Sequence, residues 1–126
     1  RGGWGSGTIN LGDAFWIQAG GSGTYDVILS GDVNTSGTNS STLAAGIDAT
    51  GLFFPVETAF QSTDLADDLP AGSVLHIWND ANQGYYTYNK AGRGGWNGNP
   101  VIVPSTGFWV EAAAGLSWDE TRPFSF

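Results

Sequence analysis

The strongest constraint in this chain of 126 residues is that its apolar runs are short and are separated by turn-forming residues. Short runs that alternate in polarity, or that are rich in β-branched and aromatic side chains, are typical of strands. Glycine accounts for 20 residues without a collagen-like period and supplies turns between these runs. The pattern predicts an all-β fold: an antiparallel β-sandwich, or a partly open barrel, of about nine short strands.

The clearest hairpin joins residues 74–78 to the tyrosine-rich residues 85–89 through a turn-rich segment. The polar tract 34–42 is predicted to be a surface loop. One short helix is expected near residues 64–69, with Thr63 as its N-cap, acidic residues in its first turn and Pro70 at its end. The remaining predicted strands are residues 15–18, 25–29, 52–56, 101–103, 108–112 and 116–118.

The two ends of the chain carry versions of one motif. The run Arg1-Gly2-Gly3-Trp4 recurs as Arg93-Gly94-Gly95-Trp96, and Phe15-Trp16 recurs 93 residues later as Phe108-Trp109. Convergent use of Gly-Trp and Phe-Trp pairs in a chain rich in both residues is the alternative explanation. In the register of the second match, the residues that agree in identity or type are Gly5 with Gly98, Ile9 with Ile102, Ile17 with Val110, Gln18 with Glu111, Ala19 with Ala112, Tyr25 with Trp118 and Asp26 with Asp119.

This repeat predicts the organisation of the chain. Residues 1–33 form a partial copy that corresponds to the tail of the unit, and residues 34–126 form one full unit. We expect the two parts to make one compact domain together. Either the two copies pair inside that domain, or one of them completes a neighbouring subunit.

A second pattern runs from the hydrophobic strand at 74–79, through the tyrosines at 85–88 and the lone Trp96, to the run Pro104-Ser105-Thr106-Gly107-Phe108-Trp109-Val110. Over about residues 52–118 this order resembles a β-sandwich repeat of very large secreted bacterial surface proteins. The resemblance implies an all-β fold and an extracellular location, and it implies no activity. In the first copy Leu11-Gly12-Asp13-Ala14 replaces Pro104-Ser105-Thr106-Gly107, which leaves open whether both copies make the same turn.

Composition excludes several classes of function. Twelve acidic and four basic residues give a net charge of −8, which excludes a phosphate-binding surface of any size and therefore nucleic acid. No apolar run is long enough for membrane insertion. The chain has no cysteine, which removes disulfides and thiolate chemistry and fits an extracellular protein without disulfides. Because the sequence opens on Arg1 in the middle of a pattern, we expect a processed or excerpted part of a longer product.

The residues that could carry chemistry do not form a catalytic set, and we predict that the protein is not an enzyme. The only histidine, His76, lies within a predicted strand with no serine nucleophile motif near it in sequence. Asp80 and Asn82 match the start of a calcium loop, but the later ligands are missing; we expect no cofactor, and calcium at these two residues is the weaker alternative. Asn34 and Asn39 match the N-glycosylation pattern and favour a surface loop.

Aromatic residues are in excess at 13%, with six tryptophans. We expect a structural subunit of an extracellular filament or surface assembly that polymerises head to tail by β-strand complementation, with residues 4–11 as the exchanged strand. The predicted subunit contacts are Trp4, Ile9, Leu11, Trp16 and Trp109.

Two alternatives stay open. One is a carbohydrate-binding module, since tryptophan and tyrosine rings on a flat sheet can stack on sugars. The other is a passive spacer repeat in a giant adhesin. The predicted stacking residues are Trp78, Tyr86, Trp96 and Trp109.

Overall fold

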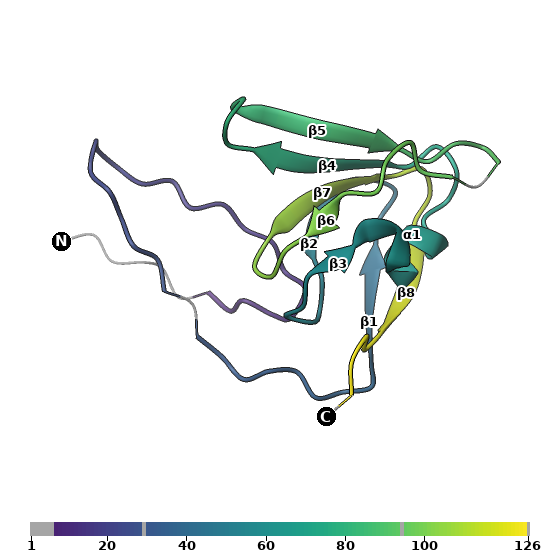
Figure 1. Ribbon diagram of the computed structural model, residues 1–126, viewed down its shortest axis with the longest axis horizontal. Coiled ribbons are helices and arrows are strands. Elements are labelled where there is room, and N and C mark those ends of the chain that lie inside the picture. Colours follow the sequence, from purple (N-terminus) through teal and green to yellow (C-terminus); the bar gives the residue numbers. More distant parts are fainter. Residues whose placement is uncertain (1–6, 29, 94, 126) are drawn as a thin grey trace.

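The computed structural model describes residues 7–28, 30–93 and 95–125 (Figure 1). Its strands in these ranges confirm the predicted all-β, antiparallel, sandwich-like fold. The elements in chain order are β1 (Thr38–Leu43), β2 (Gly46–Gly51), β3 (Thr58–Ala59), the 3-10 turn η1 (Phe60–Ser62), α1 (Asp64–Asp68), β4 (Val74–Asn79), β5 (Gly84–Asn89), β6 (Val101–Ile102), β7 (Gly107–Ala112) and β8 (Leu116–Thr121).

Three antiparallel sheets surround the core. The largest has the strand order β2-β7-β4-β5, while β1 pairs with β8 and the short β3 pairs with β6. Figure 1 shows β1 and β8 running across the direction of the large sheet, with α1 beside β8. β7 therefore lies between β2 and β4, and β5 is an outer strand of the large sheet.

Alternation of side chains explains which face of each strand is buried. In β7 the residues Phe108, Val110 and Ala112 point into the core, while Trp109 and Glu111 lie on the opposite face. One buried cluster collects residues from the sheets, the helix and the connections: Leu43, Phe53, Phe54, Phe60, Leu65, Ala66, Leu69, Leu75, Ile102, Phe108, Val110, Ala112 and Trp118.

The short helix forms where the sequence predicts it. Thr63 caps α1, because its Oγ1 accepts a hydrogen bond from the backbone N of Ala66 at 3.1 Å. At the other end the Lys90 ammonium donates to the carbonyl oxygens of Ala66 and Asp67, at 2.8 and 2.9 Å, where a helix has unpaired acceptors. No helix in the described ranges is long and apolar enough to cross a membrane.

The predicted hairpin is also confirmed. β4 pairs with β5 so that Trp78 lies opposite Tyr85 and Ile77 lies opposite Tyr86. The connecting turn places Gln83 at a positive φ of 47°, and the Asn79 Oδ1 accepts from the backbone N of Ala81 at 2.9 Å. The strands predicted at 101–103, 108–112 and 116–118 appear as β6, β7 and β8.

Three predicted strands are wrong. Residues 15–18 and the described part of 25–29 lie outside any strand, and residues 52–56 form a bend. This bend is apolar because Phe53 and Phe54 are buried at a corner of the core. The loop predicted at 34–42 is also wrong from Thr38 onward, since β1 begins there and uses its polar residues on a largely exposed strand.

Candidate functional site

The N-terminal stretch forms an arm that makes almost no regular structure. We call residues 7–28 and 30–33 the arm; these residues contain no helix or strand apart from a single bridge at Asp13. Figure 1 shows the arm leaving the body and returning to it as a wide loop. Its large apolar side chains are exposed, up to 88% for Ile28, and they are Ile9, Leu11, Phe15, Trp16, Ile17, Tyr25, Val27, Ile28 and Val33.

One tight turn attaches the arm to the body. The backbone N of Asp13 donates to the Asn10 carbonyl at 3.1 Å, and the Asp13 carboxylate accepts from the backbone N of Asn10 at 2.7 Å. The Gly12 carbonyl in turn accepts from the backbone N of Gly51 at 2.8 Å, at the end of β2. Glycine is required at position 12, because its φ is +84° and a Cβ there would lie 2.5 Å from the Phe53 ring.

A second turn of the same kind lies 93 residues later. The backbone N of Thr106 donates to the Val103 carbonyl at 3.2 Å, and Ser105 has a positive φ of 68°, matching Gly12 in the first turn. The question that the sequence leaves open is thereby answered: both copies of the repeat make the same hydrogen-bonded turn. The two turns also touch, since a Cβ on Gly107 would lie 2.8 Å from the Cβ of Ala14.

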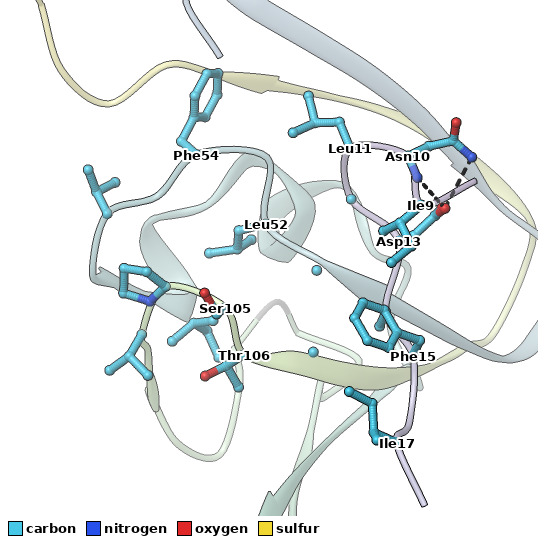
Figure 2. A pocket seen from close by; sticks show the side chains of 18 residues that line it. Ile9, Asn10, Leu11, Asp13, Phe15, Ile17, Leu52, Phe54, Ser105 and Thr106 are labelled. Carbon is cyan, nitrogen blue, oxygen red and sulfur yellow. Dashed lines mark hydrogen bonds between the residues drawn. The ribbon is translucent and has the colours of Figure 1, made fainter. Parts of the chain in front are cut away.

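An apolar groove of about 570 Å³ lies between the arm and the body. Figure 2 shows Ile9, Phe15 and Ile17 of the arm on one side, with Leu52 and Phe54 of the body across from them. Residues 9–14 and their repeat equivalents 102–107 all line this groove. Of the predicted subunit contacts, Ile9 and Leu11 lie on the groove.

Beyond the two turns the copies take different paths. Phe108 and Val110 enter the sheet as β7 and are 2% and 0% exposed. Their equivalents Phe15 and Ile17 stay outside the sheet and are 44% and 39% exposed. The arm thus has the side-chain pattern of a core strand without the burial of one.

Aromatic rings also gather on the outer face of the large sheet. Trp16 of the arm stands edge-on against Trp78 of β4 at 5.6 Å between ring centres, and Trp78 contacts Tyr85 of β5 at 5.1 Å. Trp109 of β7 lines the same shallow trough of about 280 Å³. The Trp78 indole N donates to the Asp80 carboxylate at 2.6 Å, which fixes the ring at the edge of the trough.

The structure brings together only part of the predicted stacking set. Trp78 and Trp109 both line the trough, but Tyr86 lies opposite Ile77 and therefore on the other face of the sheet. Trp96 packs edge-on against buried Phe60 at 5.0 Å and donates to the Ala66 carbonyl at 3.1 Å. The pattern missed Tyr85, although the hairpin register that pairs it with Trp78 was the available signal.

The remaining predicted site residues are Trp4, Asn34, Asn39, Asp80 and Asn82. Trp4 lies outside the described residues. Asn34 and Asn39 are half-buried, and the Asn34 Oδ1 accepts from the backbone N of Ser36 at 3.0 Å. Asn82 lies in the hairpin turn beside Asp80, and no group of three or more His, Asp or Glu side chains that could hold a metal occurs in the described ranges.

His76 also lies on the outer face of the large sheet. Its Nδ1 is 3.2 Å from the Thr87 hydroxyl, and its Nε2 is 3.9 Å from the Glu111 carboxylate. These contacts join β4, β5 and β7 on the outer face of the large sheet, and no serine takes part in them.

One acidic side chain is buried. Glu120 points inward from β8, and its carboxylate accepts from the backbone N of Leu65 at 3.3 Å. Burial raises the pKa of Glu120, and the nearby carboxylates of Asp64 and Asp68 raise it further, while backbone donors partly oppose the shift. This side chain lines neither the groove nor the trough.

Comparison of the chain with protein-family models, with curated proteins and with solved structures gave no match in any of the three.

Proposed function

We propose that this chain is a structural subunit of an extracellular filament or surface assembly, and that the arm joins one β unit to the next by strand complementation. The observation that carries the proposal is the exposed apolar side of the arm, above all Phe15 and Ile17. A strand pattern of this kind is stabilised when a sheet of another molecule accepts it.

The energetics favour association through the arm. Each large apolar side chain that moves from water into a packed site contributes about 1.5–3 kcal/mol, and a paired strand adds main-chain hydrogen bonds. Ordering a mobile segment opposes this gain. Several arm side chains must therefore be buried together for a stable contact.

We propose a donor segment other than the residues 4–11 that the sequence favours. The turn from Asn10 to Asp13 holds Leu11 and Gly12 on the chain's own body. The residues after Asp13 form no comparable backbone contact with the body in the described ranges. We therefore place the donor segment at residues 14–28.

In the described ranges, the large sheet has one edge that is covered only at its end, where Asn97 hydrogen-bonds to the backbone of Asn89. β5 is an outer strand, and its residues Gly84–Asn89 include no charged side chain and no proline. Natural sheets usually block such edges with charges, prolines or bulges. β2, the other outer strand, carries the exposed Asp48 and is touched by the arm at Thr50. The open part of the β5 edge is an additional surface for contact between neighbouring subunits, separate from the place that accepts the arm.

Sizing and electron microscopy of the purified protein test the proposal. We expect concentration-dependent polymers for the natural chain, and loss of them in the double variant Phe15→Asp with Ile17→Asp. The matched control is Gln18→Asp with Ser22→Asp, which adds the same charge at polar arm positions. A chain that stays monomeric at high concentration contradicts the proposal.

Carbohydrate binding is a second candidate because three tryptophans and a tyrosine line one trough on the sheet. Rings arranged in this way can stack on sugar rings. We expect a polysaccharide ligand to change the tryptophan emission of the natural chain. Trp78→Ala should lose this response, whereas Tyr86→Ala on the opposite face should keep it. No response across a broad glycan panel would exclude this candidate.

A further inference from the structure

The arm and the C-terminal part of the chain are related position by position, and not only at the turns. Where the C-terminal copy has a core residue, the arm has an apolar residue that is exposed. The pairs are Ile102 with Ile9, Phe108 with Phe15, Val110 with Ile17, Ala112 with Ala19 and Trp118 with Tyr25, the first of each pair being buried and the second exposed.

We infer that residues 14–28 are the closing part of a second β unit, and that their partner is a second copy of the polypeptide 34–92. This segment would occupy on that copy the place that residues 107–121 hold in this chain. This inference rests on the proposed function and specifies its contact.

The strand neighbours of the closing part all lie within residues 34–92. β7 is paired on one side with β2 and on the other with β4, and β8 is paired with β1. In this chain β7 and β8 already fill those places. The arm therefore has the sequence of these strands but no free partner within its own chain.

The side chains of the arm fit those places. Trp16 would replace Trp109 on the outer face, and Gln18 would replace Glu111, which is exposed and tolerates a polar residue. Val27 would stand where Glu120 is buried, which removes a carboxylate from a site that penalises its charge. No arm residue in this register brings a charge into the core.

The arm stays outside the sheets of this chain because the chain's own β7 and β8 already pair with β2, β4 and β1. The tail that follows residue 92 and the arm are both attached to residues 34–92, so effective concentration alone does not choose between them. In this structure the tail occupies the positions beside β2, β4 and β1, which leaves no place there for the arm. A copy of 34–92 that lacks a tail has both places open.

A graft tests the equivalence directly. Residues 104–119 are replaced by residues 11–26, a segment of the same length, in the otherwise complete chain. We expect this graft to unfold cooperatively, and a graft of the same 16 residues in scrambled order to lose cooperative unfolding. If both grafts lose cooperative unfolding to the same extent, the equivalence is wrong.

An extended chain tests the partner. Residues 34–92 are placed directly before Arg1, so that Gly92 is followed by the first copy of the repeated tetrapeptide as it is in the natural sequence. We expect the amides of residues 15–19 and 25–28 to become protected from hydrogen exchange. Phe15→Asp with Ile17→Asp in the same chain should abolish that protection.

The natural unit 34–126 serves as the internal reference in the extended chain. Protection of that unit without protection of the arm overturns the inference. Neither experiment requires polymers, so the two proposals can fail separately. A cooperative graft and a protected arm in a chain that never polymerises would keep the inference and remove the assembly role.

Discussion

Gly12 is where the arm depends most on a single residue. Its backbone has a φ of +84°, and its carbonyl holds the backbone N of Gly51. Gly12→Ala combines a strained conformation with a Cβ that would overlap the Phe53 ring. We expect the turn to leave the body and the Gly51 amide to exchange faster, while the body stays folded.

Hydrogen exchange measured by NMR checks this expectation at the Gly51 amide. Gly20→Ala is the control, because a Cβ at that arm position meets nothing within 4 Å. Equal protection of Gly51 in the natural chain and in Gly12→Ala would show that the turn does not hold the arm.

Glu120 makes the stability of the fold depend on pH. Because burial raises its pKa in the folded state, the folded chain binds this proton more tightly than the unfolded chain does. As the pH falls from above the pKa that Glu120 has in the folded chain to below its pKa in the unfolded chain, the fold becomes more stable. Above the folded-state pKa the carboxylate is ionised in the core, and its full destabilising effect on folding is present.

Glu120→Gln removes this charge and keeps an oxygen that can accept from the Leu65 backbone N. We expect the variant to be more stable than the natural chain at neutral pH, with an advantage that shrinks on acidification. Urea unfolding at several pH values measures it, with exposed Glu57→Gln as the control. A stability difference that does not vary with pH would contradict this account.

At the scale of elements, local signals were sufficient for α1 and for the β4–β5 hairpin. Thr63 and Pro70 delimit the helix within a few residues. The turn at 79–84 sets the register of the hairpin, and thus the β4 residue that lies opposite each tyrosine of β5. These features depend on neighbours in sequence, so the sequence predicts them.

The cap of α1 gives a quantitative prediction. Thr63→Ala removes the acceptor for the Ala66 backbone N and also the donor to the Phe60 carbonyl at 2.7 Å. We expect a loss of about 1–2 kcal/mol in the free energy of unfolding, measured with urea. Thr63→Ser keeps the hydroxyl and should recover most of it. Equal losses in both variants would exclude the cap as the cause.

β1 and β2 could not be predicted from their own residues. β1 is a polar strand held by β8, with Ser40 and Asp119 hydrogen-bonded although they lie 79 positions apart. Its residues look like a loop because few of them are buried. The error at 15–18 is the reverse case, since Phe15 and Ile17 have a strand pattern and lack a partner strand.

The candidate site was predictable only where a residue's position depends on its neighbours in sequence. Alternation predicts that Trp109 and Phe108 lie on opposite faces of their strand, and their positions in β7 confirm this. It could not assign Trp96, which follows a glycine-rich run and whose position depends on Phe60 and the end of α1. Trp109 was therefore predictable from its own strand, whereas Trp96 was not, because its partners Phe60 and Ala66 lie 30 or more positions earlier in the chain.

At the scale of the whole molecule, the net charge of −8 opposes close approach of copies. Salt shortens the range of this repulsion, from about 30 Å at 0.01 M to about 8 Å at 0.15 M ionic strength. We therefore expect polymerisation to increase over that range, and sedimentation of the polymer measures it. A decrease with added salt would indicate that ion pairs, rather than apolar burial, hold the copies together.

The pairing of β1 with β8 also determines how the molecule responds when it is pulled. Thr38 at the start of β1 lies opposite Thr121 at the end of β8, so tension applied between Val33, past the turn that attaches the arm, and the C-terminal segment acts at one end of this strand pair. The hydrogen bonds there are loaded one after another, beginning with those from Arg122 to the carbonyl oxygens of Thr35 and Gly37. We therefore expect this strand pair to separate one hydrogen bond at a time and at low force, because its hydrogen bonds are not loaded together in shear.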